Sequence, residues 1–146
     1  MKQILKLAIT IILFILVAQC SRAQSLRVSA TIEKAVMGVQ TGTEVSYRFK
    51  NKMGIGGFYQ KNLPNLNETS NSEYEFTGIA VSVPITQCNK IMLSGVLRAG
   101  VINRRFVIVT PSVETEVKVS KHLSFALGLG IRATEAAINT KFSWTL

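Results

Sequence analysis

The sequence predicts an all-β protein, specifically an eight-stranded antiparallel up-and-down transmembrane β-barrel. Three observations predict this fold. Apolar residues alternate with polar or small residues along most of the chain, which is the period of strands with two different faces. Within each segment, charges of both signs collect at one set of alternate positions (one parity), which would share one face of a strand. Aromatic residues gather near the segment ends. The first part of the chain also has the features of an export signal.

The N-terminal segment predicts export. The basic start Met1–Lys6 precedes an apolar run, Leu7–Ala18, which is shorter than the roughly 20 residues of a spanning helix. Ser21-Arg22-Ala23 then offers small residues at positions suited to cleavage. We therefore expect a signal peptide over residues 1–23 and an outer-membrane β-barrel domain over 24–146, with the bacterial outer membrane as the destination. A retained membrane anchor is the alternative.

Cys20 leaves a second processing route open. Val17-Ala18-Gln19-Cys20 resembles the lipobox of lipoproteins, although Gln19 is larger than the residue usually found there. Cleavage after Ala23 instead removes Cys20 and leaves Cys88 as the single cysteine of the mature chain, so that no intrachain disulfide forms.

Eight segments follow the strand period after the signal. In the clearest case, Leu123, Phe125, Leu127, Leu129 and Ile131 share one parity. The strands are expected near residues 25–33, 37–49, 53–61, 73–85, 90–102, 104–119, 121–133 and 135–146.

The connections and the remaining irregularities complete the predicted topology. Short links at one end are expected to alternate with longer ones at the other, of which Asn62–Ser72 is the clearest. The parity shifts near Thr77, where we expect a β-bulge.

The polar parity predicts a charged barrel interior. Buried charges need partners, and opposite signs on the same face supply them. Glu44 with Arg48, or Glu114 and Glu116 with Arg98, are the expected pairs. The predicted lumen charge network consists of Arg27, Glu33, Glu44, Arg48, Arg98, Glu114, Glu116, Lys118, Arg132 and Lys141.

Aromatic residues predict two interfacial girdles, which are expected where a barrel wall crosses the two membrane surfaces. One set lies near the short-turn end and comprises Tyr47, Phe49, Phe125, Phe142 and Trp144. The other set lies near the long-loop end and comprises Tyr59, Tyr74, Phe76 and Phe106.

The last segment resembles the C-terminal assembly signal of outer-membrane barrels. Ile138, Thr140, Phe142, Trp144 and Leu146 alternate up to the end of the sequence, with Leu in place of the more common Phe at the last position. Val45–Tyr59 also resembles a hairpin of small OmpA-type or OmpX-type barrels, and Gln after the cleavage site is similar to exported proteins of Bacteroidota. This resemblance implies an outer-membrane barrel with a structural or interaction role. The implied partners are outer-membrane lipid, lipopolysaccharide and the barrel assembly machinery.

Two other roles fit the same pattern. A soluble, secreted lipocalin-like barrel would bind a small apolar ligand and would place Leu127, Leu129 and Phe142 inside. An accessory subunit of a larger outer-membrane complex would use the Asn62–Ser72 link for docking. For the structural or interaction barrel, eight strands leave an interior just wide enough for side chains, so no wide pore is expected.

The sequence argues against catalysis, metal binding and nucleic-acid binding. His122 and Cys88 fall on different turns, so that no ligand cluster or nucleophile–base arrangement is expected, and no cofactor. Gly54-x-Gly56-Gly57 lacks the following helix of a phosphate loop. Arg104-Arg105 is expected at a loop tip, either as an ordinary solvated turn or in contact with lipopolysaccharide phosphates. The net charge of +9 is dispersed, which gives no support for nucleic acid as a partner.

Overall fold

The computed structural model describes residues 23–35, 38–63, 75–132 and 134–146. Cys20, Tyr74 and nearly all of the expected signal peptide lie outside these ranges, as does most of the Asn62–Ser72 link. The predicted fold class is confirmed, because eight antiparallel strands close into one barrel. The strands are β1 (Ala23–Ala35), β2 (Gly38–Phe49), β3 (Gly54–Asn62), β4 (Glu75–Cys88), β5 (Ile91–Ile102), β6 (Phe106–Lys118), β7 (Leu123–Arg132) and β8 (Glu135–Thr145).

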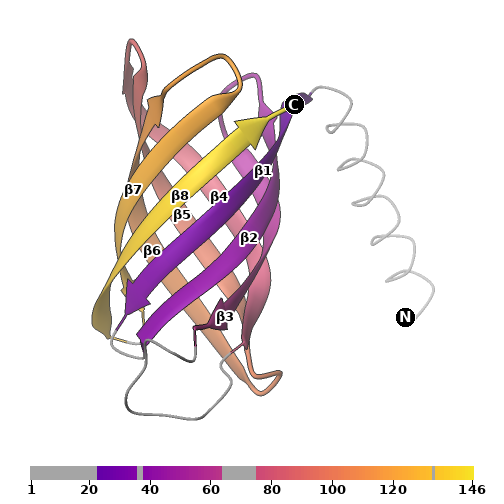
Figure 1. Ribbon diagram of the computed structural model, residues 1–146, viewed down its shortest axis with the longest axis vertical. Coiled ribbons are helices and arrows are strands. Elements are labelled where there is room, and N and C mark those ends of the chain that lie inside the picture. Colours follow the sequence, from indigo (N-terminus) through magenta and orange to yellow (C-terminus); the bar gives the residue numbers. More distant parts are fainter. Residues whose placement is uncertain (1–22, 36–37, 64–74, 133) are drawn as a thin grey trace, which may run out of the picture.

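The barrel has simple up-and-down connectivity. Each strand pairs with its neighbours in sequence, and β1 closes the barrel against β8. The start of β1 and the end of β8 lie together at the top of Figure 1. We call this the termini end and the opposite one the far end. No helix among the described residues is long and apolar enough to cross a membrane.

The connections differ from the expected alternation of short and long. The termini end carries the three links 50–53, 89–90 and 119–122, all short as expected. At the far end, however, 36–37, 103–105 and 133–134 are equally short, and 63–74 is the one long link. Tight hairpins need positive φ, which Asn103 and Arg104 adopt at 48° and 58° in the β5–β6 link.

The predicted bulge lies elsewhere in β4. Pairing with β5 is regular through Thr77 and shifts between Pro84 and Thr86, so that the extra residue is Ile85. A proline lacks the N–H of a ladder bond and is tolerated best next to such an irregularity. After the bulge the parity is reversed, which directs Gln87 toward the inside of the barrel at the termini end.

The outer face of the barrel is apolar and the inner face polar. Leu127, Leu129 and Phe142 are 51%, 67% and 49% exposed and lie on the outside. Because the lipocalin-like alternative required these three side chains inside, the structure contradicts it. The buried polar set includes Ser29, Thr31, Gln40, Gln60, Asn139 and Ser143 besides the charged residues.

Glycine at inward positions lets the backbones approach closely. A Cβ on Gly78 would lie 2.1 Å from the carbonyl oxygen of Ala99, and one on Gly128 would lie 2.4 Å from Oδ1 of Asn139. Gly54 and Gly56 are crowded in the same way, whereas Gly57 points outward and meets nothing closer than 3.8 Å. The Gly-x-Gly-Gly segment is therefore part of a strand in a narrow barrel.

Candidate functional site

The inner face gathers nine of the ten residues predicted for the charge network. They come from six strands and form two groups. The first lies nearer the termini end and contains Arg27, Arg48 and Glu116, and we call it the upper cluster. The second occupies the middle and far part of the interior, and we call it the central cluster; it contains Glu33, Glu44, Arg98, Glu114, Arg132 and Lys141.

Glu116 holds the upper cluster together. Its carboxylate accepts bonds from both terminal nitrogens of Arg27, at 3.0 and 2.8 Å. The guanidinium of Arg48 donates to the same two oxygens, at 3.2 and 2.6 Å. Arg27 also donates to the hydroxyl of Ser124. A carboxylate shared by two forked guanidinium groups leaves this cluster with one excess positive charge.

The central cluster forms a continuous chain of ion pairs. Lys141 Nζ lies 3.0 Å from Oε2 of Glu44 and 3.1 Å from Oε2 of Glu114. Arg98 bridges Oε1 of Glu114 at 2.6 Å and Oε2 of Glu33 at 3.4 Å. Arg132 completes the chain at 2.8 Å from Oε1 of Glu33. Three cations and three carboxylates balance, as buried charges require.

Some expected partners are wrong. Arg98 does pair with Glu114, but Glu116 pairs with the two upper arginines instead. Glu44 pairs with Lys141 rather than with Arg48. Parity places a residue inside a barrel, but strand tilt decides which distant strands meet across it. Lys118 also departs from the predicted network, because it is exposed at the end of β6 rather than enclosed.

An apolar plug near the far end was not expected. Phe58 and Phe76 are buried inside, with ring centroids 4.7 Å apart, and pack with Ala80 and Ile102. The guanidinium carbon of Arg132 lies 4.4 Å from the centre of the Phe76 ring. Phe76 therefore belongs to the interior and not to the aromatic girdle in which the sequence placed it. One sequence feature could have indicated this plug: Ile108 is apolar, although it shares its alternate positions with Thr110 and Ser112, and it packs against the plug.

The outward aromatic residues at the termini end do cluster. The Phe125 and Phe142 rings lie 4.9 Å apart, and the Trp144 ring stacks on His122 at 6.0 Å. Nδ1 of His122 donates to the Thr145 carbonyl oxygen at 3.0 Å. His122 thus sits at the rim with polar and aromatic neighbours.

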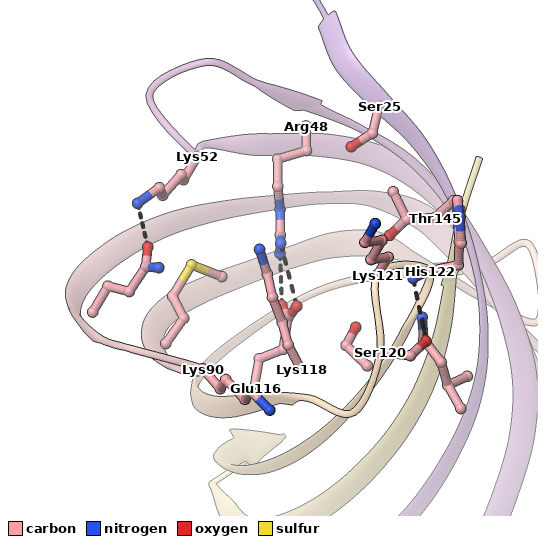
Figure 2. A pocket seen from close by; sticks show the side chains of 14 residues that line it. Ser25, Arg48, Lys52, Lys90, Glu116, Lys118, Ser120, Lys121, His122 and Thr145 are labelled. Atoms are coloured by element: carbon pink, nitrogen blue, oxygen red, sulfur yellow. Dashed lines mark hydrogen bonds and ion pairs between the residues drawn. The ribbon is translucent and has the colours of Figure 1, made fainter.

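The enclosed space is concentrated at the termini end. A cavity of about 130 Å³ lies inside this rim, and we call it the vestibule. Cavities of about 30 and 10 Å³ lie beside the upper and central clusters. Figure 2 shows the vestibule, with Arg48, Lys52, Lys90, Lys118 and Lys121 arranged around it and dashed lines joining Arg48 to Glu116.

The structure brings none of the other polar candidates together. Cys88 is an exposed free thiol, and no group of three or more potential metal ligands occurs in the described ranges. Arg104 and Arg105 are exposed at the far-end β5–β6 turn. What the geometry provides is a charged interior, an aromatic plug and one basic opening.

The comparisons identify the fold. No protein-family model and no curated protein matches the sequence. A de novo designed transmembrane β-barrel aligns with 85% of this chain and 97% of its own, at 12% identity and a TM-score of 0.71. The designed barrel TMB2.3 aligns with 82% and 94%, at 9% identity and a TM-score of 0.62. Neisserial surface protein A aligns with 84% and 95%, at 10% identity and a TM-score of 0.48. The closed order of the eight strands and the likeness to the two designed barrels show that the chain has the fold of an eight-stranded transmembrane β-barrel.

Proposed function

We propose that this chain is a bacterial outer-membrane β-barrel with a structural or interaction role, whose charge-filled interior leaves no wide pore. The outer surface carries this proposal. On the outward parity of the described strands, charges occur at Lys34, Lys61 and Glu75, all near the far end. The other outward residues of these strands are uncharged, and many are large and exposed, such as Val107, Leu129 and Ile131. A soluble monomer rarely exposes a continuous apolar surface of this kind.

The strand lengths support the same environment. A tilted strand needs about 9 to 11 residues to cross the hydrocarbon core of a bilayer. The eight strands contain between 9 and 14 residues, so that each is long enough. A closed barrel also satisfies every ladder bond internally, as lipid demands.

The proposed assembly signal has the exposure that recognition would need. Ile138, Phe142 and Trp144 are exposed on the outside of β8, and Leu146 is exposed directly after it, where the barrel assembly machinery could contact them. In the membrane, the same face would contact lipid. Arg104 and Arg105 at the far-end rim would then lie near the phosphates of lipopolysaccharide. The proposed role is not catalytic.

Cysteine labelling in membranes tests the location. In a Cys88→Ser background, Leu127→Cys would place one thiol at mid-wall, and Lys121→Cys would place a control thiol at the termini-end rim. In membrane fragments open on both sides, we expect a membrane-impermeant maleimide to modify the rim thiol and spare the wall thiol until urea unfolds the barrel. Lipid excludes the charged reagent from the outer face of β7.

Equal labelling of the two thiols in membranes would contradict the proposal. Recovery of the unmodified protein in the soluble periplasmic fraction would contradict it as well. A folding control is heat-modifiable migration on gels, which must be retained in both cysteine variants.

A further inference from the structure

The vestibule carries an uncompensated positive charge. Its lining includes the five cations Arg48, Lys52, Lys90, Lys118 and Lys121, whereas Glu116 is the single carboxylate among the residues that line it. Both oxygens of Glu116 are already engaged by Arg27 and Arg48. The four lysines therefore face one small space without a carboxylate of their own (Figure 2).

The backbone holds these lysines close to one another. The amide of Lys118 donates to the carbonyl oxygen of Lys90 at 2.9 Å, which places the two at adjacent corners of the β5–β6 pair. Lys52 adopts a positive φ of 66°, and its Nζ donates to Gln87, which lines the same space. In the described part of the chain, no ion pair joins Lys90, Lys118 or Lys121 to a carboxylate. Crowded like charges repel, and a bound anion would relieve that repulsion.

Neutral donors complete the lining. The Ser120 oxygen accepts the amides of His122 and Leu123 at 3.3 and 3.1 Å, which leaves its hydroxyl proton to donate. Ser25 and Thr145 add two more hydroxyl groups. Ammonium, guanidinium and hydroxyl donors around one space are the groups that bind phosphate oxygens.

We propose that the vestibule binds a phosphate group, presented either by an anionic lipid headgroup or as free phosphate. The volume of about 130 Å³ holds several water molecules but is well below the 300 to 1,000 Å³ of pockets that enclose a whole small molecule. A single phosphate fits this size and this charge. The inference does not depend on the proposed membrane location, because the cluster exists in the folded barrel itself.

A charge-matched pair of variants tests the proposal. Lys90→Gln/Lys118→Gln removes two vestibule cations, and Arg104→Gln/Arg105→Gln removes two exposed cations from the far end. The full chain, purified in a zwitterionic detergent, is titrated with inorganic phosphate and pyrophosphate by calorimetry. The amide shifts of Ser120 and His122 are followed by nuclear magnetic resonance. A second arm uses nanodiscs of phosphatidylcholine with and without phosphatidylglycerol.

Shifts at Ser120 and His122 with phosphate or pyrophosphate would identify a free phosphate, and shifts that need phosphatidylglycerol would identify a headgroup. In either arm, the vestibule variant should lose about tenfold or more in affinity. The far-end variant should change by less than about twofold. Equal losses in the two variants would show a general charge effect and overturn the proposal, as would the absence of binding in both arms. Heat-modifiable migration checks that each variant is folded.

Discussion

At the scale of single residues, Glu116 is the most constrained charge in the barrel. It accepts four hydrogen bonds from two guanidinium groups, and its side chain is almost fully enclosed. Buried ion pairs add little net stability compared with apolar residues, but losing one partner leaves the other charge uncompensated. Glu116 therefore adds little net stability, but its removal would leave the charges of Arg27 and Arg48 uncompensated.

The substitution Glu116→Gln should destabilise the barrel by about 3 kcal/mol, because it leaves Arg27 and Arg48 facing each other without a carboxylate. The measurement is urea unfolding of the protein in detergent or lipid vesicles. Glu135→Gln, at the exposed start of β8, is the matched control and should change stability by less than about 0.5 kcal/mol. Similar midpoints for the two variants would contradict this prediction, because they would show that pairing Glu116 with Arg27 and Arg48 does not affect stability.

At the scale of strands, the interface between β4 and β5 depends on a pair of glycines. Gly78 and Gly100 lie opposite each other, and a Cβ on either would fall within 2.4 Å of the facing backbone. Real Cβ atoms do not approach so closely, so the strands would have to separate. The glycines permit the tight coiling of a narrow barrel at this point.

Gly78→Ala should therefore lower the free energy of unfolding by about 1 to 3 kcal/mol through overpacking. Gly57→Ala is the control on the neighbouring strand, since its Cβ would have open space outside and nothing closer than 3.8 Å. Denaturant titration of both variants gives the comparison. A Gly57→Ala loss as large as that of Gly78→Ala would mean that strand flexibility, rather than backbone proximity, makes these glycines necessary.

The alternation of residues was enough to predict the strands, their order and most of their bounds. Alternation alone left both face assignments open, and the exposure of Leu127, Leu129 and Phe142 shows that the charged face is the inner one. Alternation could not predict the contacts across the interior. Lys141 reaches Glu44, and Arg132 reaches Glu33, through the tilt and stagger of strands that are distant in sequence.

The alternation of residues also failed to predict the position of the β4 bulge and the inward aromatic residues. Ile85 shifts the register without a marked change in composition, so the bulge was placed near Thr77 instead. Phe76 looks like an interfacial aromatic in sequence, and only the structure shows that it points inward together with Phe58. The vestibule lysines come from three separate turns and from the end of β6, which converge only when the barrel closes.

At the scale of the whole molecule, the described part of the interior contains three successive layers of side chains, from which we expect a barrel closed to solutes. The upper cluster lies below the vestibule, the central cluster follows, and the plug around Phe76 lies near the far end. Cavities beside the clusters measure about 30 and 10 Å³, room for one or two water molecules.

The purified barrel should consequently show no steady ion conductance in a planar bilayer. Phe58→Ala/Phe76→Ala should remain non-conducting, because the two charge clusters still fill the interior. Single-channel recording makes the measurement, and heat-modifiable migration verifies that the protein is folded. A stable open level in the unsubstituted protein would contradict the closed interior, and one that appears in the double variant would assign the barrier to the plug alone.

The pairing of β1 with β8 has a consequence for folding. Arg27 lies opposite Thr145, and Lys34 lies opposite Ile138, so each of these contacts joins residues more than a hundred positions apart. Such contacts form slowly, because a long loop must be closed before they add any stability. Every other neighbouring pair of strands is a local hairpin that can form earlier. We therefore expect closure to be the final and slowest step of folding, before which the ion pairs of the interior have no enclosed space in which to form.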